Sequence, residues 1–239
     1  GATGVAIVNE DGQLTGVQIT SAGTGYTSAP TMKIEDSRVM GSIHTEFTRG
    51  TSLGVLVTPN TWRNQISTGD LTLQTSAQAN AVSLTADHGQ LSLQASAKLT
   101  STTSLDMTLQ GGLLEQANAV VSAQNIKLQA GTGDVALAQA AKLTASANLS
   151  LSVLQGDTFV ASHSLITAGS ALTFQVSTGD VNFATEAQLT SGDAMKVTVG
   201  TGNVDFASKA VMTAAKTLDF AVTTGNVSFA TEAKMSSGD

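Results

Sequence analysis

The feature that most constrains this chain is a repeat of 23 residues. The segment STGDVNFATEAQLTSGD at residues 177–193 returns almost unchanged as TTGNVSFATEAKMSSGD at residues 223–239. A fixed period of 20 to 50 residues is typical of proteins built from stacked structural units. Turn-type glycines mark the same period, at 23-residue spacing over the last five and at 20–22 residues before that: Gly69, Gly89, Gly111, Gly133, Gly156, Gly179, Gly202 and Gly225.

Aligned copies show three segments per period in which apolar and polar residues alternate. Alternation with period two is the pattern of a strand with one buried side. Each period therefore predicts three short strands. The inward columns are Leu137, Val160, Phe183, Phe206 and Phe229 in the first segment, Leu143, Ile166, Leu189, Met212 and Met235 in the second, and Leu149, Leu172, Met195 and Leu218 in the third.

A unit of this size cannot bury its own apolar side, but it can do so as one rung of a coil stacked on the next. The sequence therefore predicts an all-β fold, a parallel β-helix or β-solenoid over residues 61–239, with Phe183, Phe206 and Phe229 in one internal stack. The outward columns support parallel stacking in register, because neighbouring rungs carry opposite charges, as in Lys196 and Asp219. A column of small residues is expected at a tight corner: Ala138, Ala161, Ala184, Ala207 and Ala230.

Residues 1–60 do not follow the period and predict a separate small β unit. Strands are expected at residues 5–8, 14–19 and 31–34, the first two joined by a turn at Asp11 and Gly12. Phe47 and Trp62 lie in the lead-in to the repeats. They are expected either to plug the open end of the coil or, with the neighbouring arginines Arg38, Arg49 and Arg63, to form a contact surface.

Composition narrows the possible partners. The formal charge of −7 is spread along the chain without a cluster of Lys or Arg, which argues against nucleic acid and anionic membranes as partners. No apolar run approaches the ~18 residues of a membrane span. Cys is absent, so disulfides play no part in the fold.

No catalytic, cofactor or metal-binding residues are predicted. His44, His88 and His163 are far apart, and the outward acids Asp106, Asp205 and Asp219 fall in different columns or on distant rungs. Because hydrolysis of a polysaccharide needs convergent carboxylates, an enzyme is the weaker alternative, and no exposed aromatic platform for a sugar is expected. The turn column could serve the backbone or hold Ca²⁺ between rungs: Asp134, Asp157, Asp180, Asn203 and Asn226.

Two resemblances suggest a role. The rungs of residues 67–239, with their GDVxFAxxAxLT rhythm, resemble the repeats of filamentous-haemagglutinin-like adhesins, which are giant secreted proteins of bacterial surfaces. The Gly-x-Gly-Tyr-x-x-x-Pro loop at Gly23, Gly25, Tyr26 and Pro30 resembles a motif of large bacterial surface proteins. These resemblances imply a rod outside the cell.

The expected function is that of a non-catalytic stalk segment in a longer adhesin. Its partners would be further repeats of the parent protein, another copy of the chain, or a glycan or protein on the surface of a host or neighbouring cell. A self-assembling extracellular filament and a phage tail-fibre or tailspike shaft remain alternatives. Because residue 239 is the counterpart of residue 193 within a rung, we expect the parent protein to continue beyond this segment.

Overall fold

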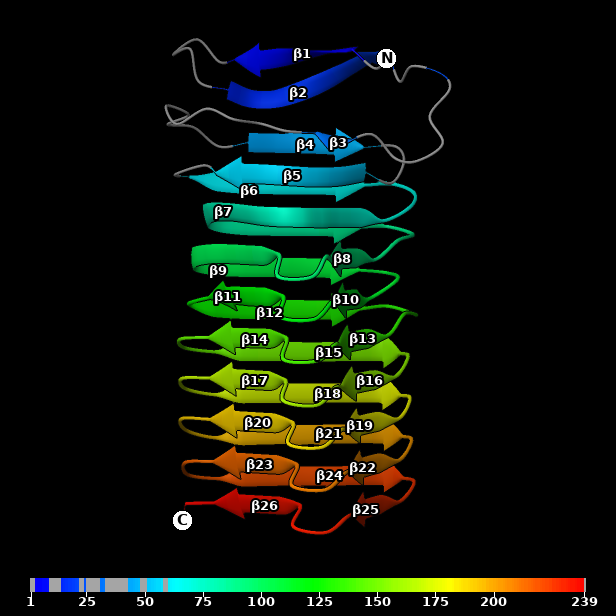
Figure 1. The fold of residues 1–239 in the computed structure, drawn as a ribbon, viewed down its shortest axis with the longest axis vertical. Helices are drawn as coiled ribbons and strands as arrows, with labels where there is room; N and C mark the ends of the chain where they lie inside the picture. Colours follow the sequence, from blue (N-terminus) through cyan, green and yellow to red (C-terminus); the bar gives the residue numbers. More distant parts are fainter. Residues whose placement is uncertain are drawn as a thin grey trace.

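The computed structural model describes residues 3–8, 14–21, 24, 31–32, 43–47, 51–57 and 60–238. Over that part the chain forms strands and no helix, and parallel strands stack into a β-solenoid of about eight turns (Figure 1). The predicted all-β fold and parallel β-helix are therefore confirmed. Successive rungs follow one another along the long axis of the molecule.

Each regular rung has three strands, which form three sides of the coil. The first side consists of β8 (Leu91–Leu93), β10 (Leu113–Glu115), β13 (Val135–Leu137), β16 (Thr158–Val160), β19 (Val181–Phe183), β22 (Val204–Phe206) and β25 (Val227–Phe229). The second consists of β11 (Val120–Ala123), β14 (Lys142–Ala145), β17 (Leu165–Ala168), β20 (Gln188–Ser191), β23 (Val211–Ala214) and β26 (Lys234–Ser237). The third consists of β12 (Asn125–Ala130), β15 (Leu149–Gln155), β18 (Leu172–Thr178), β21 (Met195–Thr201) and β24 (Leu218–Thr224).

Nearer the N-terminus the strands are longer and bend around the coil. β7 (Leu71–Ala86) pairs in succession with β8 and with two parts of β9 (Lys98–Leu109), so a single strand covers all three sides. β6 (Thr61–Ile66) pairs in parallel with the last part of β7. The shorter upstream period is thus accommodated without a break in the stack.

Every regular strand pairs in parallel with its counterpart one rung away. Val181 is opposite Val204 on the first side, and Phe174 is opposite Val197 on the third. Parallel hydrogen-bonded strands lie ~4.8 Å apart, so equivalent side chains are brought into contact. The 23-residue register that the sequence predicts is the register of the structure.

A column of glycines allows the rungs to approach at the corner before the first side. Gly179 has φ +142°, and a Cβ added there would lie 1.9 Å from the carbonyl oxygen of Gly156. A Cβ added at Gly202 would lie at the same distance from the carbonyl oxygen of Gly179. A side chain at this corner would therefore force the rungs apart, which explains why the glycine recurs.

The corner between the first and second sides is a β-turn whose third residue has positive φ without being glycine. Glu186 has φ 60°; its N–H donates to the carbonyl of Ser208 in the next rung (3.1 Å). The N–H of Ala187 closes the turn on the carbonyl of Ala184 (3.0 Å). The same conformation occurs in seven rungs, with φ between 59° and 64°, at Ser96, Asn118, Ala140, His163, Glu186, Lys209 and Glu232.

The alanine column lies at this corner, as the sequence predicts. Ala138 and Ala184 are half-buried, because they are the first residues of the turns. The fully buried small residues come three positions later, as in Ala141 and Ala187 at 0% exposure. This second, fully buried column of small residues was not singled out from the sequence.

The interior is filled by the predicted inward columns. Phe183 stacks on Phe206 with ring centroids 4.9 Å apart, and Phe206 stacks on Phe229 at 4.7 Å. The predicted internal stack of three rings is confirmed. Phe229 is 50% exposed because it lies in the last described rung.

The N-terminal strands are β1 (Thr3–Val8), β2 (Leu14–Ser21), β3 (Thr31–Met32), β4 (Ile43–Phe47) and β5 (Thr51–Val57). β1 and β2 pair antiparallel, while β4 pairs in parallel with β6 and β5 with β7. Strands occur in all three predicted places. The expected turn at Asp11 and Gly12, the Gly-x-Gly-Tyr-x-x-x-Pro loop, Arg38 and Arg49 lie outside the described residues, and the unit boundary at residue 60 stays a prediction.

Candidate functional site

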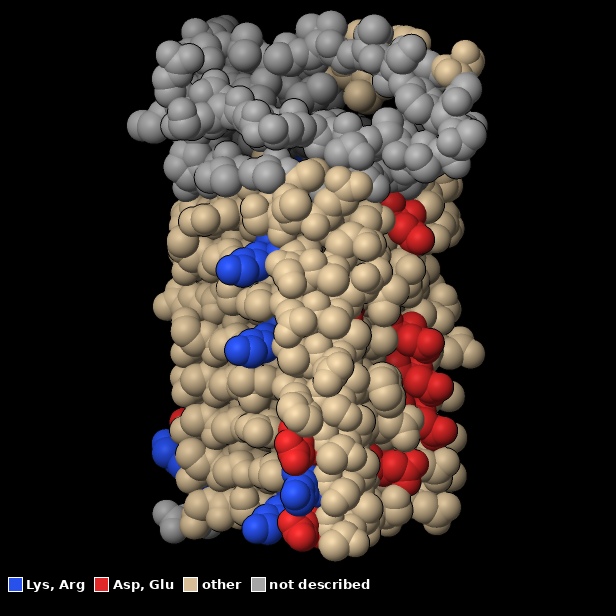
Figure 2. Space-filling view, viewed as in Figure 1, with Lys and Arg blue, Asp and Glu red and all other residues tan. Residues whose placement is uncertain are grey.

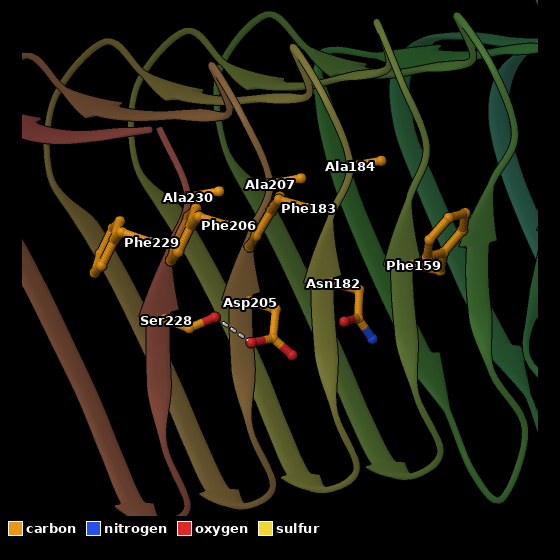
Figure 3. Close-up of a pocket in the computed structure, with 10 residues that line it drawn as sticks. All are labelled: Phe159, Asn182, Phe183, Ala184, Asp205, Phe206, Ala207, Ser228, Phe229 and Ala230. Atoms are coloured by element: carbon orange, nitrogen blue, oxygen red, sulfur yellow. Dashed lines mark hydrogen bonds between the residues drawn. The ribbon is translucent and has the colours of Figure 1, made fainter. Parts of the chain in front are cut away.

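A shallow, open depression of about 500 Å³ lies on the first side of the coil (Figure 3). It runs along the axis over β16, β19, β22 and β25. One of its margins is polar and the other is made of methyl groups. The lining residues are Phe159, Asn182, Asp205 and Ser228, the alanines Ala184, Ala207 and Ala230, and the three stacked phenylalanines.

The polar margin follows from the strand alternation. Asn182, Asp205 and Ser228 are the middle residues of three-residue strands, so their side chains point out while those on either side point in. The Ser228 hydroxyl donates to Asp205 Oδ1. The depression thus offers one carboxylate, one amide and one hydroxyl in a row.

Phe159 is an exposed aromatic residue that the sequence analysis missed. It occupies the same outward column one rung before Asn182, and its exposed fraction is 46%. Leu154 lies at the end of β15, just before the corner that leads into β16, and is 62% exposed. The expectation that no aromatic platform is exposed is therefore wrong, and the missed signal was the position of Phe159 directly after inward-facing Thr158.

The predicted acids do not converge on a catalytic site. Asp106 and Asp219 share one outward column on the third side, but Lys127, Ser150, Thr173 and Lys196 lie between them. Asp205 is on the first side. Among the described side chains, no group of three or more His, Cys, Asp or Glu is placed to hold a metal ion. Paired carboxylate chemistry thus has no partner for Asp205 among these acids.

The three histidines are also separate. His163 is one of the turn residues with positive φ, and its Nε2 lies 3.5 Å from Glu186 Oε2. His88 is exposed. His44 lies in β4, and its side chain is outside the described part. No shared function follows from these positions.

The Asp/Asn turn column forms a ladder of side-chain to backbone hydrogen bonds. Asp134 Oδ1 accepts the N–H of Asp157 (2.8 Å), and Asp157 Oδ1 accepts that of Asp180 (2.8 Å). In the same way Asp180 Oδ1 accepts the N–H of Asn203, and Asn203 Oδ1 accepts that of Asn226. Each side chain therefore satisfies a backbone donor at the corner of the next rung, which is the turn role that the sequence suggests.

Charged residues on the outside pair between rungs. Lys196 Nζ lies 3.3 Å from Asp219 Oδ2, as the columns predict, and Lys209 Nζ lies 3.9 Å from Glu186 Oε1. Figure 2 shows such alternating charges near the lower end of the rod. These pairs are exposed, so each is worth at most about 1 kcal/mol and mainly favours the correct register.

Trp62 does not form a contact surface. Its exposed fraction is 1%, and it lies in the inward column over Val82 and Leu105. Of the two roles expected for the aromatic residues before the repeats, packing inside the coil is the one observed for Trp62. The side chain of Phe47 is outside the described part.

Glu115 is a buried carboxylic acid that the sequence analysis did not single out. It lies in the inward column of the first side, between Leu93 and Leu137, and its exposed fraction is 0%. Burial raises the pKa of its carboxyl well above the usual range. The signal was present in the sequence, since Glu115 lies 22 residues from each of these leucines.

Comparisons with known proteins assign no family. No family model, no curated protein and no solved structure matches the chain. None of the described residues form a helix that could span a lipid bilayer.

Proposed function

We propose that this chain is a non-catalytic stalk segment of a large secreted or cell-surface bacterial adhesin. The observation that carries the proposal is the uniform register from β13 to β26, in which each rung repeats the outline of the one before. Such a coil adds length in equal steps of ~4.8 Å per rung. Length with little change in surface chemistry is what a spacer requires.

The surface supports a structural role in preference to catalysis. The outward acids are spread over two sides and the corners, and several of them are engaged by backbone N–H groups or lysines. The depression at Phe159 and Asn182 is shallow and carries a single carboxylate, Asp205. A binding contact there, with a glycan or protein, would be a local addition to the rod.

A self-assembling filament is the second candidate. Equivalent residues of β22 and β25 pair in parallel, and rungs of another copy that kept this register would pair in the same way. A phage shaft is disfavoured, because trimer formation needs an apolar stripe along the outside. In the described stretch from β6 to β24, the large exposed apolar side chains are Leu154 and Phe159, on the two sides of a single corner.

Two measurements test the proposal. Small-angle scattering of a monodisperse stalk gives a rod of constant cross-section at all concentrations, whereas growth with concentration indicates a filament and a threefold mass indicates a shaft. Deleting residues 157–202, two whole periods, joins Gly156 to Asn203 in register and shortens the rod by about 10 Å. In cells that display the parent protein, adhesion survives this deletion if the segment is a spacer, and its loss contradicts the proposal.

A further inference from the structure

Glu115 has no polar partner in the interior of the coil. Neither Oε1 nor Oε2 has a hydrogen-bond partner, and the exposed fraction of the residue is 0%. It is the only Asp, Glu, Lys, Arg or His among the buried residues of the described part. Natural cores tolerate such a group only when it is neutral or compensated.

No charge faces Glu115 from the strands around it. The adjacent strands β8 and β13 and the nearby β11 carry no titratable residue. β9 carries Lys98 and Asp106, β12 carries Lys127 and β14 carries Lys142, but all four side chains are exposed on the outside of the coil. The inward residues of these strands are apolar, among them Leu91, Leu93, Leu99, Val121, Leu128, Val135 and Leu137.

The ionised form of Glu115 is therefore incompatible with the closed rung. A carboxylate in this position would lose its hydration without gaining a hydrogen bond or a cation, which strongly disfavours the charged form. Loss of the proton can be accommodated only if the side chain reaches water. This requires that β10 leave its place between β8 and β13.

The local chain is suited to such a movement. β10 is only three residues long, and it follows directly on the pair Gly111 and Gly112, the latter with φ +91°. A β-turn at residues 116–119 ends the segment, closed by the N–H of Ala119 on the carbonyl of Gln116 (3.0 Å). Glycine pairs allow backbone rotation that other residues resist, so opening can stay local.

We infer that the rung of β10 is a proton-dependent joint in the rod, closed while Glu115 carries its proton and open to water once the proton is lost. The inference rests on the burial of Glu115 and not on the proposed role as a stalk. In a rod under tension, this rung is the place where the coil yields first at high pH. At low pH, where Glu115 is neutral, it stays closed.

The direction of the pH effect follows from linkage. The pKa of Glu115 is raised in the closed state, so the closed state binds the proton more tightly than the open one. Closure is therefore strongest below pH about 4.5, the ordinary value, and weakens as pH rises toward the raised pKa of the closed rung. Within that window the opening constant rises by up to about tenfold per pH unit.

Hydrogen exchange measured by mass spectrometry tests the joint on the full chain. Exchange, corrected for its intrinsic pH dependence, is followed from pH 4.5 to 8.5 in peptides covering residues 109–119 and, as an internal reference, residues 195–206. Wild type is compared with Glu115→Gln and Glu115→Leu, and Glu232→Gln serves as the control because Glu232 is exposed.

In wild type and Glu232→Gln, we expect the opening constant of the β10 peptide to rise steeply with pH while the reference peptide stays constant. Both Glu115 variants should lose that slope, and Glu115→Leu should be protected at every pH. An equal slope in wild type and Glu115→Gln overturns the inference, as does a slope shared by the reference peptide. If Glu115→Leu does not fold, Glu115→Gln decides the question.

Discussion

The rings of Phe206 and Phe229 lie parallel, with an interplanar angle of 0° and centroids 4.7 Å apart. This separation equals the spacing of hydrogen-bonded strands, so backbone pairing and side-chain packing are satisfied by the same repeat. It also implies an offset stack, which aromatic rings prefer to a direct sandwich. Phe183 stacks on the other side of Phe206, with ring centroids 4.9 Å apart, so the ring of Phe206 is held from both sides inside the coil.

Phe206→Ala should destabilise the chain strongly, because it removes the middle of this stack. Phe206 is 1% exposed, and loss of a buried Phe costs about 3–5 kcal/mol. Denaturant unfolding measures the change. Phe159→Ala is the matched control, since its ring is 46% exposed, and a change near 0.5 kcal/mol is expected there. Equal effects of the two substitutions would contradict the internal stack.

Gly179→Ala should be far more costly than Gly131→Ala. At position 179 the new Cβ would meet the carbonyl oxygen of Gly156 at 1.9 Å, where φ is +142°. At position 131 it would meet only the end of the Gln110 side chain, which can move aside. Melting temperatures compare the two variants. The explanation of the glycine column is wrong if both variants have the melting temperature of the wild type.

Substitutions at Ala140 should act in opposite directions. Its φ of 59° is left-handed, a conformation that Asn tolerates and β-branched residues resist. Ala140→Asn is therefore expected to stabilise by up to about 1 kcal/mol, as at Asn118 in the preceding rung, and Ala140→Val to destabilise by at least as much. Unfolding free energies of the pair test the turn conformation, and the reverse order would rule it out.

The Asp ladder should depend on the acceptor oxygen and not on charge. Asp157→Ala removes the partner of the Asp180 N–H and should cost about 1 kcal/mol. Asp157→Asn keeps that oxygen and removes a like charge beside Asp134 and Asp180, so stability should stay equal or rise, most at low salt. A loss on Asp157→Asn that follows calcium concentration would instead support a Ca²⁺ site.

The strand pattern was predictable because side chains alternate strictly and each rung repeats the last. Val181, Phe183 and Leu189 could be placed inside from their spacing alone. The corners were harder, since alternation stops there. The half-buried position of Ala184 follows from a turn with positive φ at Glu186, and no feature of a Glu or Lys in the sequence announces that conformation.

Features of single rungs are not predicted by the repeat, because the alignment of equivalent positions shows only what recurs. Phe159 and Glu115 are each unlike their counterparts one rung away, Asn182 and Leu137. Their positions follow from the register, but their consequences depend on neighbours across the coil. Those neighbours are known only once the three sides are assembled.

Cysteine pairs test the stacking of rungs most directly, because the chain has no native cysteine. Thr173 and Lys196 lie opposite each other on the outer face of β18 and β21, within the range for a disulfide. Thr173→Cys with Lys196→Cys should oxidise readily within one molecule, whereas Thr173→Cys with Thr198→Cys, two residues out of register, should not. Equal oxidation of the two pairs, or failure of the first alone, would contradict a coil with a 23-residue rung.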